Sequence, residues 1–371
     1  MQIKPHLKNL IPYPPGKTIN EIKKELGISG KVYKLNSNEN PLGPSPKVIE
    51  TLKNCLLEVH HYPEANYQEL KEILAKKWNI LPEQIILGNG SNEIIEFLFK
   101  SIINPDDEII ISKPSFLMYE KFAEIYGAKI KLVPLTKDLK HNFAEILKSI
   151  SERTKIIFLD HPHNPSGSVL NRKDWQDFLK NLPSHILTVI DEAYGEFIED
   201  PSVPLGIEFL KNGYKVLILR TFSKAYGLAG LRLGYGISFI ELSKVLDSVR
   251  QPFNINLLAY KAGLAVLQDK EYIEKSISLV KEGRKYLIEK LTSFGFKVYP
   301  SQANFIMVDF GEKAEKIYQE LLKRGILVRP LKAYGFSNAL RISIGLPEEN
   351  KTLVENIKKL IKKTNLTKNS K

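Results

Sequence analysis

The chain has 371 residues, a formal net charge of +12 and 43% hydrophobic residues. A chain of this length and hydrophobic content can bury a large core and is expected to form two domains. The single cysteine, Cys55, excludes an intrachain disulfide and a cysteine-rich zinc site. No apolar run reaches the roughly eighteen residues of a membrane span, and the N-terminus lacks the apolar segment of a signal peptide. We therefore expect a cytoplasmic protein.

The positive charge is spread along the chain. Lysines alternate with glutamates, for example over residues 281–290, and no basic stripe is interleaved with aromatic residues. This pattern favours anionic small substrates over nucleic acid. A basic nucleic-acid-binding protein remains an alternative from another functional class.

Short apolar runs alternate with longer amphipathic stretches, a pattern typical of an α/β fold with a largely parallel sheet. The apolar runs predict the strands of this sheet, and the stretches between most of them predict helices. The predicted strands are Gln84–Leu87, Glu108–Ser112, Lys129–Pro134, Lys155–Leu159, Leu187–Ile190, Val216–Leu219 and Arg232–Ile237.

Helical spacing of apolar residues predicts helices over 92–103 and 117–126, and a long helical run over 257–293 that could bridge two domains. After Gly295, shorter pieces indicate a smaller α+β domain. The lysine-rich tail after Lys362 is predicted to be disordered. The pieces of the smaller domain are strands at 297–299, 305–309, 326–328 and 340–344 and a helix at 313–324. The predicted division is an N-terminal arm (1–30), a large domain (31–260) and a linking helix with the small C-terminal domain (261–371).

Lys224 is the residue that points most directly to chemistry. It follows the apolar strand at 216–219 and precedes a segment of glycines and apolar residues. Burial in such surroundings lowers the pKa of an amine, which can then form a Schiff base with pyridoxal phosphate. Thr221, Ser223 and Arg232 would supply donors for the cofactor's phosphate. The alternative is that Lys224 is one more surface lysine.

Polar residues also follow other predicted strands, where open α/β sheets bind ligands. Asp191 could face the cofactor's ring nitrogen, which must stay protonated, although an aspartate here could instead cap a helix. Asn164 and Tyr194 offer donors for the ring's 3-oxygen. Phe116 could stack on the ring or belong to the core. Ser91 and Asn92 follow Gly90 at a predicted helix start and could form an anion cup.

Two other kinds of site are disfavoured by the same residues. Gly88-Asn89-Gly90 begins like a dinucleotide-binding fingerprint, but Glu93 stands at the third glycine position, where its carboxylate would repel a pyrophosphate. The histidine pairs 60–61 and 161/163 have no further ligand at a suitable spacing. We therefore expect no hydride-transferring dehydrogenase and no metal site.

The motifs together resemble a known family. The chain resembles fold-type I aminotransferases in three motifs. They are Asn164-Pro165 with its following glycine, Asp191-Glu192-Ala193-Tyr194, and Ser223-Lys224 with Arg232. The segments 12–17 and 35–46 and Tyr62-Pro63 narrow this resemblance, because they resemble histidinol-phosphate aminotransferases in particular. The resemblance extends from the N-terminal arm to Gly345. It departs at His161 and His163, where the family commonly has asparagines, so the local turn is expected to differ.

The resemblance implies a role for each matching residue. Lys224 would hold pyridoxal 5'-phosphate covalently and then shuttle a proton, while Asp191 would pair with the pyridinium nitrogen. Asn164 and Tyr194 would hold the 3-oxygen. The residues that would surround the phosphate are Ser91, Asn92, Thr221, Ser223 and Arg232.

The resemblance also implies a homodimer with shared active sites. In that family the tyrosine that matches Tyr62 reaches the phosphate of the neighbouring subunit's cofactor. The alternative is that Tyr62 simply packs beside Pro63.

Substrate recognition is expected to rest on arginines, because the substrates differ in their anionic groups and an arginine can bind either a phosphate or a carboxylate. Arg329 and Arg341 interrupt apolar runs at predicted strand ends and match the family's substrate arginines. Tyr13 would join them. Surface ion pairs are the alternative role for the two arginines.

The resemblance therefore implies a homodimeric histidinol-phosphate aminotransferase, which would transfer an amino group between histidinol phosphate and 2-oxoglutarate in histidine biosynthesis. Two alternatives keep the cofactor and the fold: an aromatic amino-acid aminotransferase and a phosphothreonine decarboxylase.

Overall fold

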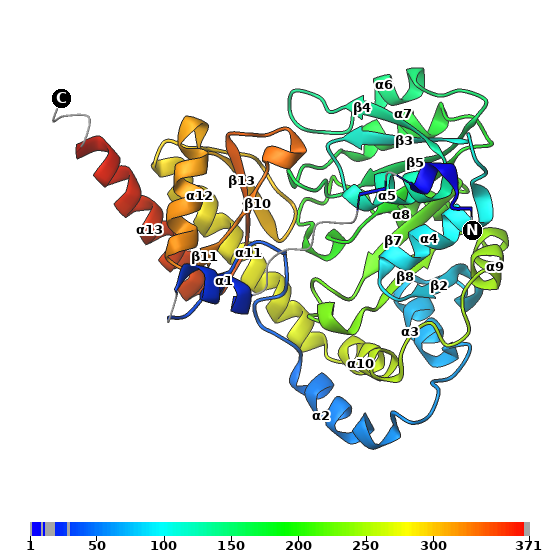
Figure 1. Ribbon diagram of the computed structural model, residues 1–371. Coiled ribbons are helices and arrows are strands. Elements are labelled where there is room, and N and C mark those ends of the chain that lie inside the picture. The colour runs from blue at the N-terminus through cyan, green and yellow to red at the C-terminus, as the bar shows by residue number, and fades with distance from the viewer. Residues whose placement is uncertain (1, 9, 12–18, 28–29, 367–371) are drawn as a thin grey trace.

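The computed structural model describes residues 2–8, 10–11, 19–27 and 30–366. Two sheets lie side by side, a seven-stranded sheet on one side of the molecule and a four-stranded sheet on the other (Figure 1). The long helix α11 (Lys270–Ser293) runs from beside α10 (Leu257–Leu267) to the smaller sheet. In the described part of the chain, no helix combines the length and the apolar character needed to span a membrane.

The large sheet has the order β2-β8-β7-β6-β5-β3-β4. All of its neighbouring strands are parallel except the pairs that β8 makes with β2 and β7. This confirms the predicted α/β class and the mostly parallel sheet. The strands are β2 (Ile85–Gly88), β3 (Glu108–Lys113), β4 (Lys129–Pro134), β5 (Thr154–Asp160), β6 (Leu187–Asp191), β7 (Val216–Thr221) and β8 (Gly234–Ile237).

The predicted strand over 232–237 begins two residues late. Arg232 has a φ of +59°, a left-handed conformation that cannot continue a strand, so β8 begins at Gly234. This residue turns the chain into the sheet and leaves its own side chain at the strand's edge.

Helices cover both faces of the large sheet. Buried side chains of α4, α5 and α9 pack on one face, and those of α3, α6, α7, α8 and α10 on the other. Strands buried on both faces are expected in a parallel sheet, and every residue of β6 is buried. The helices in this part are α2 (Pro46–Cys55), α3 (Gln68–Trp78), α4 (Ser91–Ile102), α5 (Leu117–Tyr126), α6 (Phe143–Lys148), α7 (Arg172–Lys180), α8 (Gly206–Lys211) and α9 (Ile240–Ser248).

The predicted helical run over 257–293 is two helices. Asp269 separates them, and its Oδ1 accepts a hydrogen bond from the backbone N–H of Tyr272 at 3.3 Å, which caps α11. Its Oδ2 accepts another from Ser45 Oγ at 2.5 Å. Ser45 in turn caps α2. One aspartate thus ends the continuous run and fixes α11 to α2.

The smaller sheet is antiparallel, with the order β12-β13-β10-β9. A separate parallel pair joins Tyr33–Lys34 (β1) to Ile326–Leu327 (β11). The predicted domain boundaries at residues 30 and 260 stay predictions. The β1–β11 pair joins the predicted large domain to the predicted small domain. The remaining elements here are β9 (Lys297–Val298), β10 (Phe305–Asp309), β12 (Arg329–Pro330), β13 (Ala339–Ser343), α12 (Ala314–Lys323) and α13 (Pro347–Leu366).

The prediction of a disordered tail after Lys362 is wrong for residues 363–366, which continue α13; residues 367–371 lie outside the described part. Buried Leu353, Ile357 and Leu360 recur at helical spacing on α13. This buried apolar face stabilises α13, and residues 363–366 continue the same helix.

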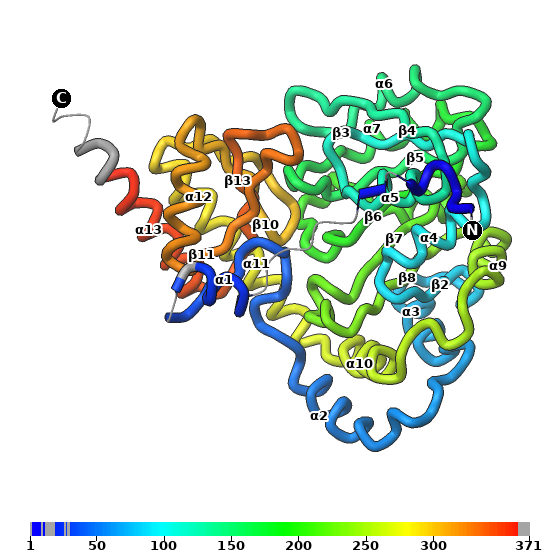
Figure 2. Tube along the Cα trace, viewed as in Figure 1, coloured from blue at the N-terminus to red at the C-terminus, as the bar shows by residue number. Residues whose placement is uncertain are grey.

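The N-terminal segment crosses to the large sheet (Figure 2). Residues 5–7 form a 3₁₀ turn, and His6 donates from Nε2 to the carbonyl oxygen of Ile125 on α5 at 3.1 Å. The helix α1 (Ile19–Leu26) follows. The other 3₁₀ turns are Leu56–Glu58, Pro82–Gln84, Gly195–Phe197, Ala229–Leu231, Gly311–Lys313 and Lys332–Tyr334.

Gly234 permits β8 to approach the start of α4. A Cβ at Gly234 would overlap the backbone nitrogen of Ser91 and lie 2.6 Å from the carbonyl carbon of Gly90. We expect Gly234→Ala to lower the free energy of unfolding by roughly 1–3 kcal/mol, because backbone atoms cannot move aside as a flexible side chain can. Urea unfolding would measure this.

Gly230→Ala is the matched control, since a Cβ at Gly230 would have no atom within 4 Å. It should change the unfolding free energy little. Equal stabilities for the two variants would contradict the close approach of β8 to α4.

Candidate active site

A cavity of about 250 Å³ lies where the carboxyl ends of β5, β6 and β7 meet. The structure gathers in it every predicted cofactor residue except Tyr62. It also brings in residues that the sequence did not single out as site residues, among them Ser37, Glu39 and Asp160. The lining residues are Ser37, Glu39, Ser91, Asn92, Phe116, Asp160, Asn164, Asp191, Ala193, Tyr194, Thr221, Ser223, Lys224, Ala229 and Arg232.

Lys224 projects into this cavity. Its Nζ donates to the carbonyl oxygen of Ser37 at 3.2 Å and lies 5.7 Å from the centre of the Tyr194 ring. Burial, helped by the charges of Arg341 and Arg232, lowers the pKa of Lys224 from 10.5 to about 8. Roughly a tenth of the amine is therefore neutral, and so nucleophilic, at pH 7.

One end of the cavity is built to hold an anion. The first turn of α4 brings Ser91 and Asn92 to it, with the positive end of the helix dipole. Asn92 Oδ1 is buried and has no hydrogen-bond partner among the described residues. Arg232 Nη1 donates to the carbonyl oxygen of Ala229 at 3.0 Å and, weakly, to Ser223 Oγ at 3.4 Å.

Gly90 leaves room for the Arg232 guanidinium at this anion-binding end. It has a φ of +75°, and a Cβ there would lie 2.5 Å from Arg232 Nη2. Thr221 Oγ1 accepts from the backbone N–H of Ser223 at 3.1 Å, which leaves the Thr221 hydroxyl proton to donate. The end therefore offers one cation and several hydroxyl and amide donors.

The cavity is also lined by Asp191, which is 5% exposed. Its Oδ2 accepts from the hydroxyl of Tyr119 at 2.8 Å and its Oδ1 from the backbone N–H of Ala193 at 3.0 Å. Burial raises the pKa of Asp191 to about 6; the hydrogen bond from Tyr119 opposes this, and the charge of Asp160 adds to it. The aspartate closes a local turn here, and Tyr194 precedes the next 3₁₀ turn, so Asp191 is not the cap of a helix.

Tyr119 was missed by the sequence interpretation. It lies on α5 three residues after Phe116, whose ring meets it edge-on at 5.4 Å between centroids. Three residues is the spacing that brings two helical side chains together. That spacing was the available signal, but a tyrosine in an apolar helix is equally typical of the core.

Asn164 and Tyr194 are held by polar partners from distant segments. Asn164 Oδ1 accepts from Arg341 Nη1 at 2.6 Å, so its amide nitrogen is left to donate. The Tyr194 hydroxyl accepts from Asn38 Nδ2 at 3.0 Å. Burial raises the pKa of Tyr194 to about 12, so this hydroxyl keeps its proton. Both residues thus present a donor to the middle of the cavity.

The two predicted substrate arginines are register partners on adjacent antiparallel strands. Arg329 opens β12, and Arg341 pairs with it from the middle of β13 rather than from a strand end as predicted. Arg341 is 7% exposed and its Nη2 donates to the carbonyl oxygen of Asn36 at 2.9 Å. A surface ion pair therefore does not describe Arg341. Neither arginine is among the residues that line the cavity itself.

Tyr62 lies away from the cavity of its own chain. Its side chain is 78% exposed and stacks on Phe253 with ring centroids 4.4 Å apart. The prediction that it completes a neighbouring subunit's site stays a prediction. Tyr13 and the segment 12–17 lie outside the described residues.

Comparisons with known proteins agree with this geometry. A family described as "Aminotransferase class I and II" matches residues 30–357. The chain belongs to this family. It is 40% identical over 368 residues to the histidinol-phosphate aminotransferase of Desulfotalea psychrophila, covering 98% of this chain and 97% of that one. The enzyme of the same name from Moorella thermoacetica is also 40% identical, over 94% of this chain and 90% of its own.

Solved structures of this family have the same fold. Histidinol-phosphate aminotransferase from Sinorhizobium meliloti, in complex with pyridoxal-5'-phosphate, superposes with a TM-score of 0.86 and 25% identity, covering 97% of this chain and 98% of that one. The enzyme from Clostridium acetobutylicum gives a TM-score of 0.81 and 29% identity over 89% of this chain and 99% of its own. The predicted fold-type I architecture and the resemblance to histidinol-phosphate aminotransferases are confirmed.

The two histidines at which this chain departs from the family are both buried. His163 donates from Nε2 to the carbonyl oxygen of Pro114 at 2.8 Å, and its Nδ1 lies 2.7 Å from Ser166 Oγ. His161 instead packs edge-on against Trp175 at 5.3 Å, and burial lowers its pKa to about 3. Neither lines the cavity, whereas Asn164, which follows them in the chain, does. The expected difference in the local turn stays a prediction.

Glu93 has a structural role in this chain. Its Oε2 accepts from the backbone N–H of Asn89 at 2.7 Å and from Asn254 Nδ2 at 2.6 Å. The carboxylate therefore braces the loop before α4. In the described residues, no group of three or more histidine, cysteine, aspartate or glutamate side chains is arranged to hold a metal ion.

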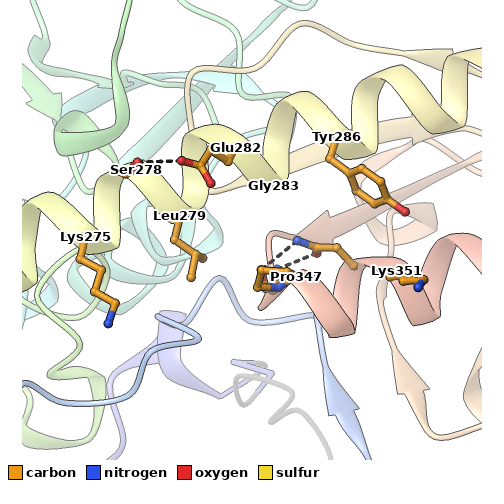
Figure 3. Close-up of a pocket in the computed structure, with 10 residues that line it drawn as sticks. Lys275, Ser278, Leu279, Glu282, Gly283, Tyr286, Pro347 and Lys351 are labelled. Carbon is orange, nitrogen blue, oxygen red and sulfur yellow. Dashed lines mark hydrogen bonds between the residues drawn. The ribbon is translucent and has the colours of Figure 1, made fainter.

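A larger cavity, of about 600 Å³, lies between α11 and the start of α13 (Figure 3). Leu279, Tyr286 and Pro347 line it together with Lys275 and Lys351. None of the predicted site residues that the structure describes lines it. The smaller cavity, which Lys224 and Asp191 both line, is therefore the candidate active site.

Asp191→Asn should change the stability of the cofactor-free protein in a pH-dependent way. The pKa of Asp191 is raised in the folded state, so the unfolded chain releases this proton at lower pH and stability falls as pH rises from about 4 to 6. The amide cannot ionise, so we expect it to raise the free energy of unfolding by on the order of 2 kcal/mol above pH 6 and to give no gain near pH 4. Thermal unfolding at the two pH values measures this.

Asp138→Asn, at an exposed aspartate, serves as control and should show no such difference between the two pH values. A gain for Asp191→Asn of equal size at both pH values would contradict a raised pKa in the folded protein.

Proposed function

We propose that the protein is a pyridoxal-phosphate-dependent histidinol-phosphate aminotransferase. It would exchange an amino group between histidinol phosphate and 2-oxoglutarate, giving imidazole-acetol phosphate and glutamate, in histidine biosynthesis. The observation that carries the proposal is that one cavity is lined by Lys224, by the cation Arg232 and by the buried carboxylate of Asp191. The full-length relatives named histidinol-phosphate aminotransferases support the choice of substrate.

The residues of the cavity fit this cofactor. Arg232, Ser223, Thr221 and the first turn of α4 would hold its phosphate. Asp191 would hold the ring nitrogen in its protonated form. The cofactor, when bound, supplies an electron sink for the carbanion formed at the substrate's reacting carbon.

Lys224 would carry out the proton transfer. Its lowered pKa makes Nζ a nucleophile that can hold the cofactor covalently near neutral pH. As a free base in the cavity, the same Nζ would accept the proton from the substrate's reacting carbon. The contact to the Ser37 carbonyl oxygen orients the amine within the cavity.

Asn164 and Tyr194 would orient the cofactor by donating to its 3-oxygen. The orientation of Asn164 follows from its partner: because Arg341 occupies the amide oxygen, the amide nitrogen faces the other way. Tyr194 accepts from Asn38 and retains its own proton for donation. Phe116 lines the same cavity and would pack against the ring.

Arg341 and Arg329 would bind the anionic groups of the two substrates. Arg341 joins the substrate end to the cofactor end through its bond to Asn164, and Arg329 is its neighbour across the strands. A guanidinium can pair with either a phosphate or a carboxylate, which is what an enzyme for histidinol phosphate and 2-oxoglutarate requires. Tyr13 stays a predicted third member of this group.

The protein would act as a homodimer with shared active sites. The exposed Tyr62–Phe253 stack lies near other exposed apolar side chains, Leu56, Leu57 and Val59, and such a patch is typical of an interaction surface. Tyr62 on this patch would reach the cofactor phosphate of the partner subunit. A cytoplasmic location stays a prediction.

Half-reactions test the substrate. The visible absorbance band of the reconstituted enzyme should disappear faster with histidinol phosphate than with phenylalanine or phosphothreonine, because only histidinol phosphate combines the expected anion with an imidazole side chain. Stopped-flow absorbance measures the rates. Lys224→Ala is the control: it should lack the band and lose activity by roughly 10⁴-fold or more.

Faster reaction with phenylalanine would instead indicate an aromatic aminotransferase, and release of carbon dioxide from phosphothreonine would indicate a decarboxylase. If the wild-type protein developed no visible band with pyridoxal phosphate, the proposed enzyme class would be wrong.

Shared sites can be tested by subunit mixing. Lys224→Ala and Tyr62→Ala homodimers should each be nearly inactive, whereas a hybrid dimer contains one site with both native residues. Mixing equal amounts under exchange conditions should restore about a quarter of the wild-type activity, since half the dimers are hybrids with one intact site each. No gain over the unmixed variants would contradict a role for Tyr62 in the partner's site.

A further inference from the structure

Asp160 is a second buried carboxylate in the cavity. It ends β5 and is the register partner of Asp191, which ends the parallel neighbour β6. Register partners on parallel strands point to the same face, and both side chains line the cavity. Asp160 is only 3% exposed. The sequence interpretation assigned it no role, and the proposed function uses only Asp191 at this end.

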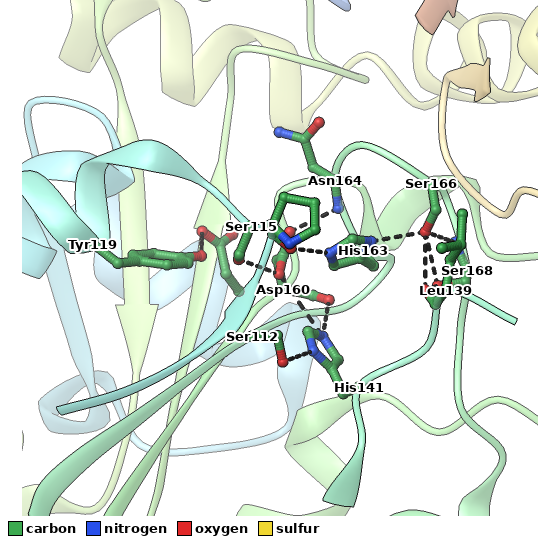
Figure 4. Close-up of polar contacts among 12 residues, drawn as sticks. Ser112, Ser115, Tyr119, Leu139, His141, Asp160, His163, Asn164, Ser166 and Ser168 are labelled. Carbon is green, nitrogen blue, oxygen red and sulfur yellow. Dashed lines mark hydrogen bonds and ion pairs between the residues drawn. The ribbon is translucent and has the colours of Figure 1, made fainter. Parts of the chain in front are cut away.

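Both carboxylate oxygens of Asp160 are engaged by the loops that carry cofactor residues (Figure 4). Oδ1 accepts from Ser115 Oγ at 2.7 Å, one residue before Phe116. Oδ2 accepts from the backbone N–H of Asn164 at 2.7 Å. One side chain therefore ties together the loop before α5 and the loop that presents the Asn164 amide.

His141 contacts the backbone carbonyl of Asp160 and does not neutralise the charge of its carboxylate. Its Nε2 lies 2.8 Å from the carbonyl oxygen of Asp160, which can only accept, so Nε2 carries a proton. Its Nδ1 lies 2.7 Å from Ser112 Oγ and can accept from that hydroxyl. Neutral imidazole satisfies both bonds, and burial lowers the pKa of His141 to about 4. The distance from Nε2 to Asp160 Oδ1 is 3.7 Å, longer than a hydrogen bond.

Ser112, His141 and Asp160 together have the composition of a hydrolytic triad, but their arrangement excludes that function. Ser112 is 1% exposed and His141 is 3% exposed, so no substrate could reach the hydroxyl. The histidine also contacts the backbone carbonyl of Asp160 rather than its carboxylate. The group is a support for the end of β5.

We propose that Asp160 is a positioning residue of the aminotransferase site: it fixes Asn164 through its backbone N–H and holds a second negative charge beside Asp191. This rests on the proposed function. The paired carboxylates make the surroundings of the bound cofactor more negative than Asp191 alone would, and so favour protonated, cationic forms of it. The titratable groups whose charges interact with Asp160 are Asp191 on β6, Tyr119 on α5, Tyr194 after β6, and His141. The cations near this end are Arg341, bound to Asn164, and Lys224.

Asp160→Asn separates charge from shape. The amide oxygen can still accept from Asn164, and the amide nitrogen can donate to Ser115 Oγ, which can accept. Ser115→Ala is the complementary variant, because it removes one hydrogen bond to Asp160 and keeps the charge. A purely structural role for Asp160 would make both variants alike.

The experiment is a pH titration of the visible absorbance of the reconstituted enzymes, which reports the proton held at the Lys224 nitrogen when the cofactor is bound. Removing the negative charge should lower the titration midpoint of Asp160→Asn by roughly one pH unit relative to wild type. Ser115→Ala should titrate with wild type. Asp160→Ser should show the same lowered midpoint and serves if Asp160→Asn does not fold, as judged by its thermal unfolding.

A midpoint for Asp160→Asn or Asp160→Ser that stays at the wild-type value, or rises above it, would overturn the inference. An equal fall in Ser115→Ala would also overturn it, because the effect would then come from the hydrogen bond alone. Failure of the proposed function looks different: the wild-type protein itself would develop no visible band.

Discussion

Asp160, Asp191 and Leu219 lie side by side across β5, β6 and β7, and this register decides where the rest of the site can be. All three strands are buried on both faces, so a slip of one residue would move every core side chain to the wrong face. The pairing is therefore held by the whole core rather than by the polar residues themselves. It delivers two carboxylates to one sheet edge and starts the Lys224 segment beside them.

The same burial acts in opposite directions on the acid and the amine of this cavity. It raises the pKa of Asp191 to about 6 and lowers the pKa of Lys224 to about 8, so both groups move toward their neutral forms. Without the cofactor, the fold thus carries polar groups whose charges are poorly solvated. The charges of a phosphate and a ring cation complement the two ends. The poorly solvated charges can therefore destabilise the cofactor-free protein and still favour binding of the cofactor.

Local sequence patterns predicted the elements that bury one continuous apolar face. The predicted strand Lys129–Pro134 and the predicted helix at 117–126 agree with β4 and α5 at both ends. The prediction failed where a single polar residue stops a regular pattern: Asp269 divides the run at 257–293, and Arg232 delays β8. A hydrophobic pattern carries no signal for such an interruption, because the interruption is a local hydrogen bond or a left-handed residue.

The cavity follows the same division. Lys224, Asp191 and Asn164 stood out because each follows an apolar strand in a recognisable motif, and Arg232 stood out because it lies just downstream of Lys224. The structure gathers all four in one cavity. Asp160 was hidden because it ends an apolar run and reads as the start of a loop. His141 lies 19 residues away from it in the chain and gave no pattern at all.

The sequence by itself predicted Lys224 as the reacting amine and determined the chemical types of its neighbours, since side-chain type and strand position are local properties. Tertiary structure alone decided which groups share charge and orientation: Arg341 turning the Asn164 amide, Tyr119 holding Asp191, and Asp160 placed beside Asp191 by strand register. The physical reason is that hydrogen-bond geometry and Coulomb interaction depend on separations of a few ångströms, which distances along the chain do not specify.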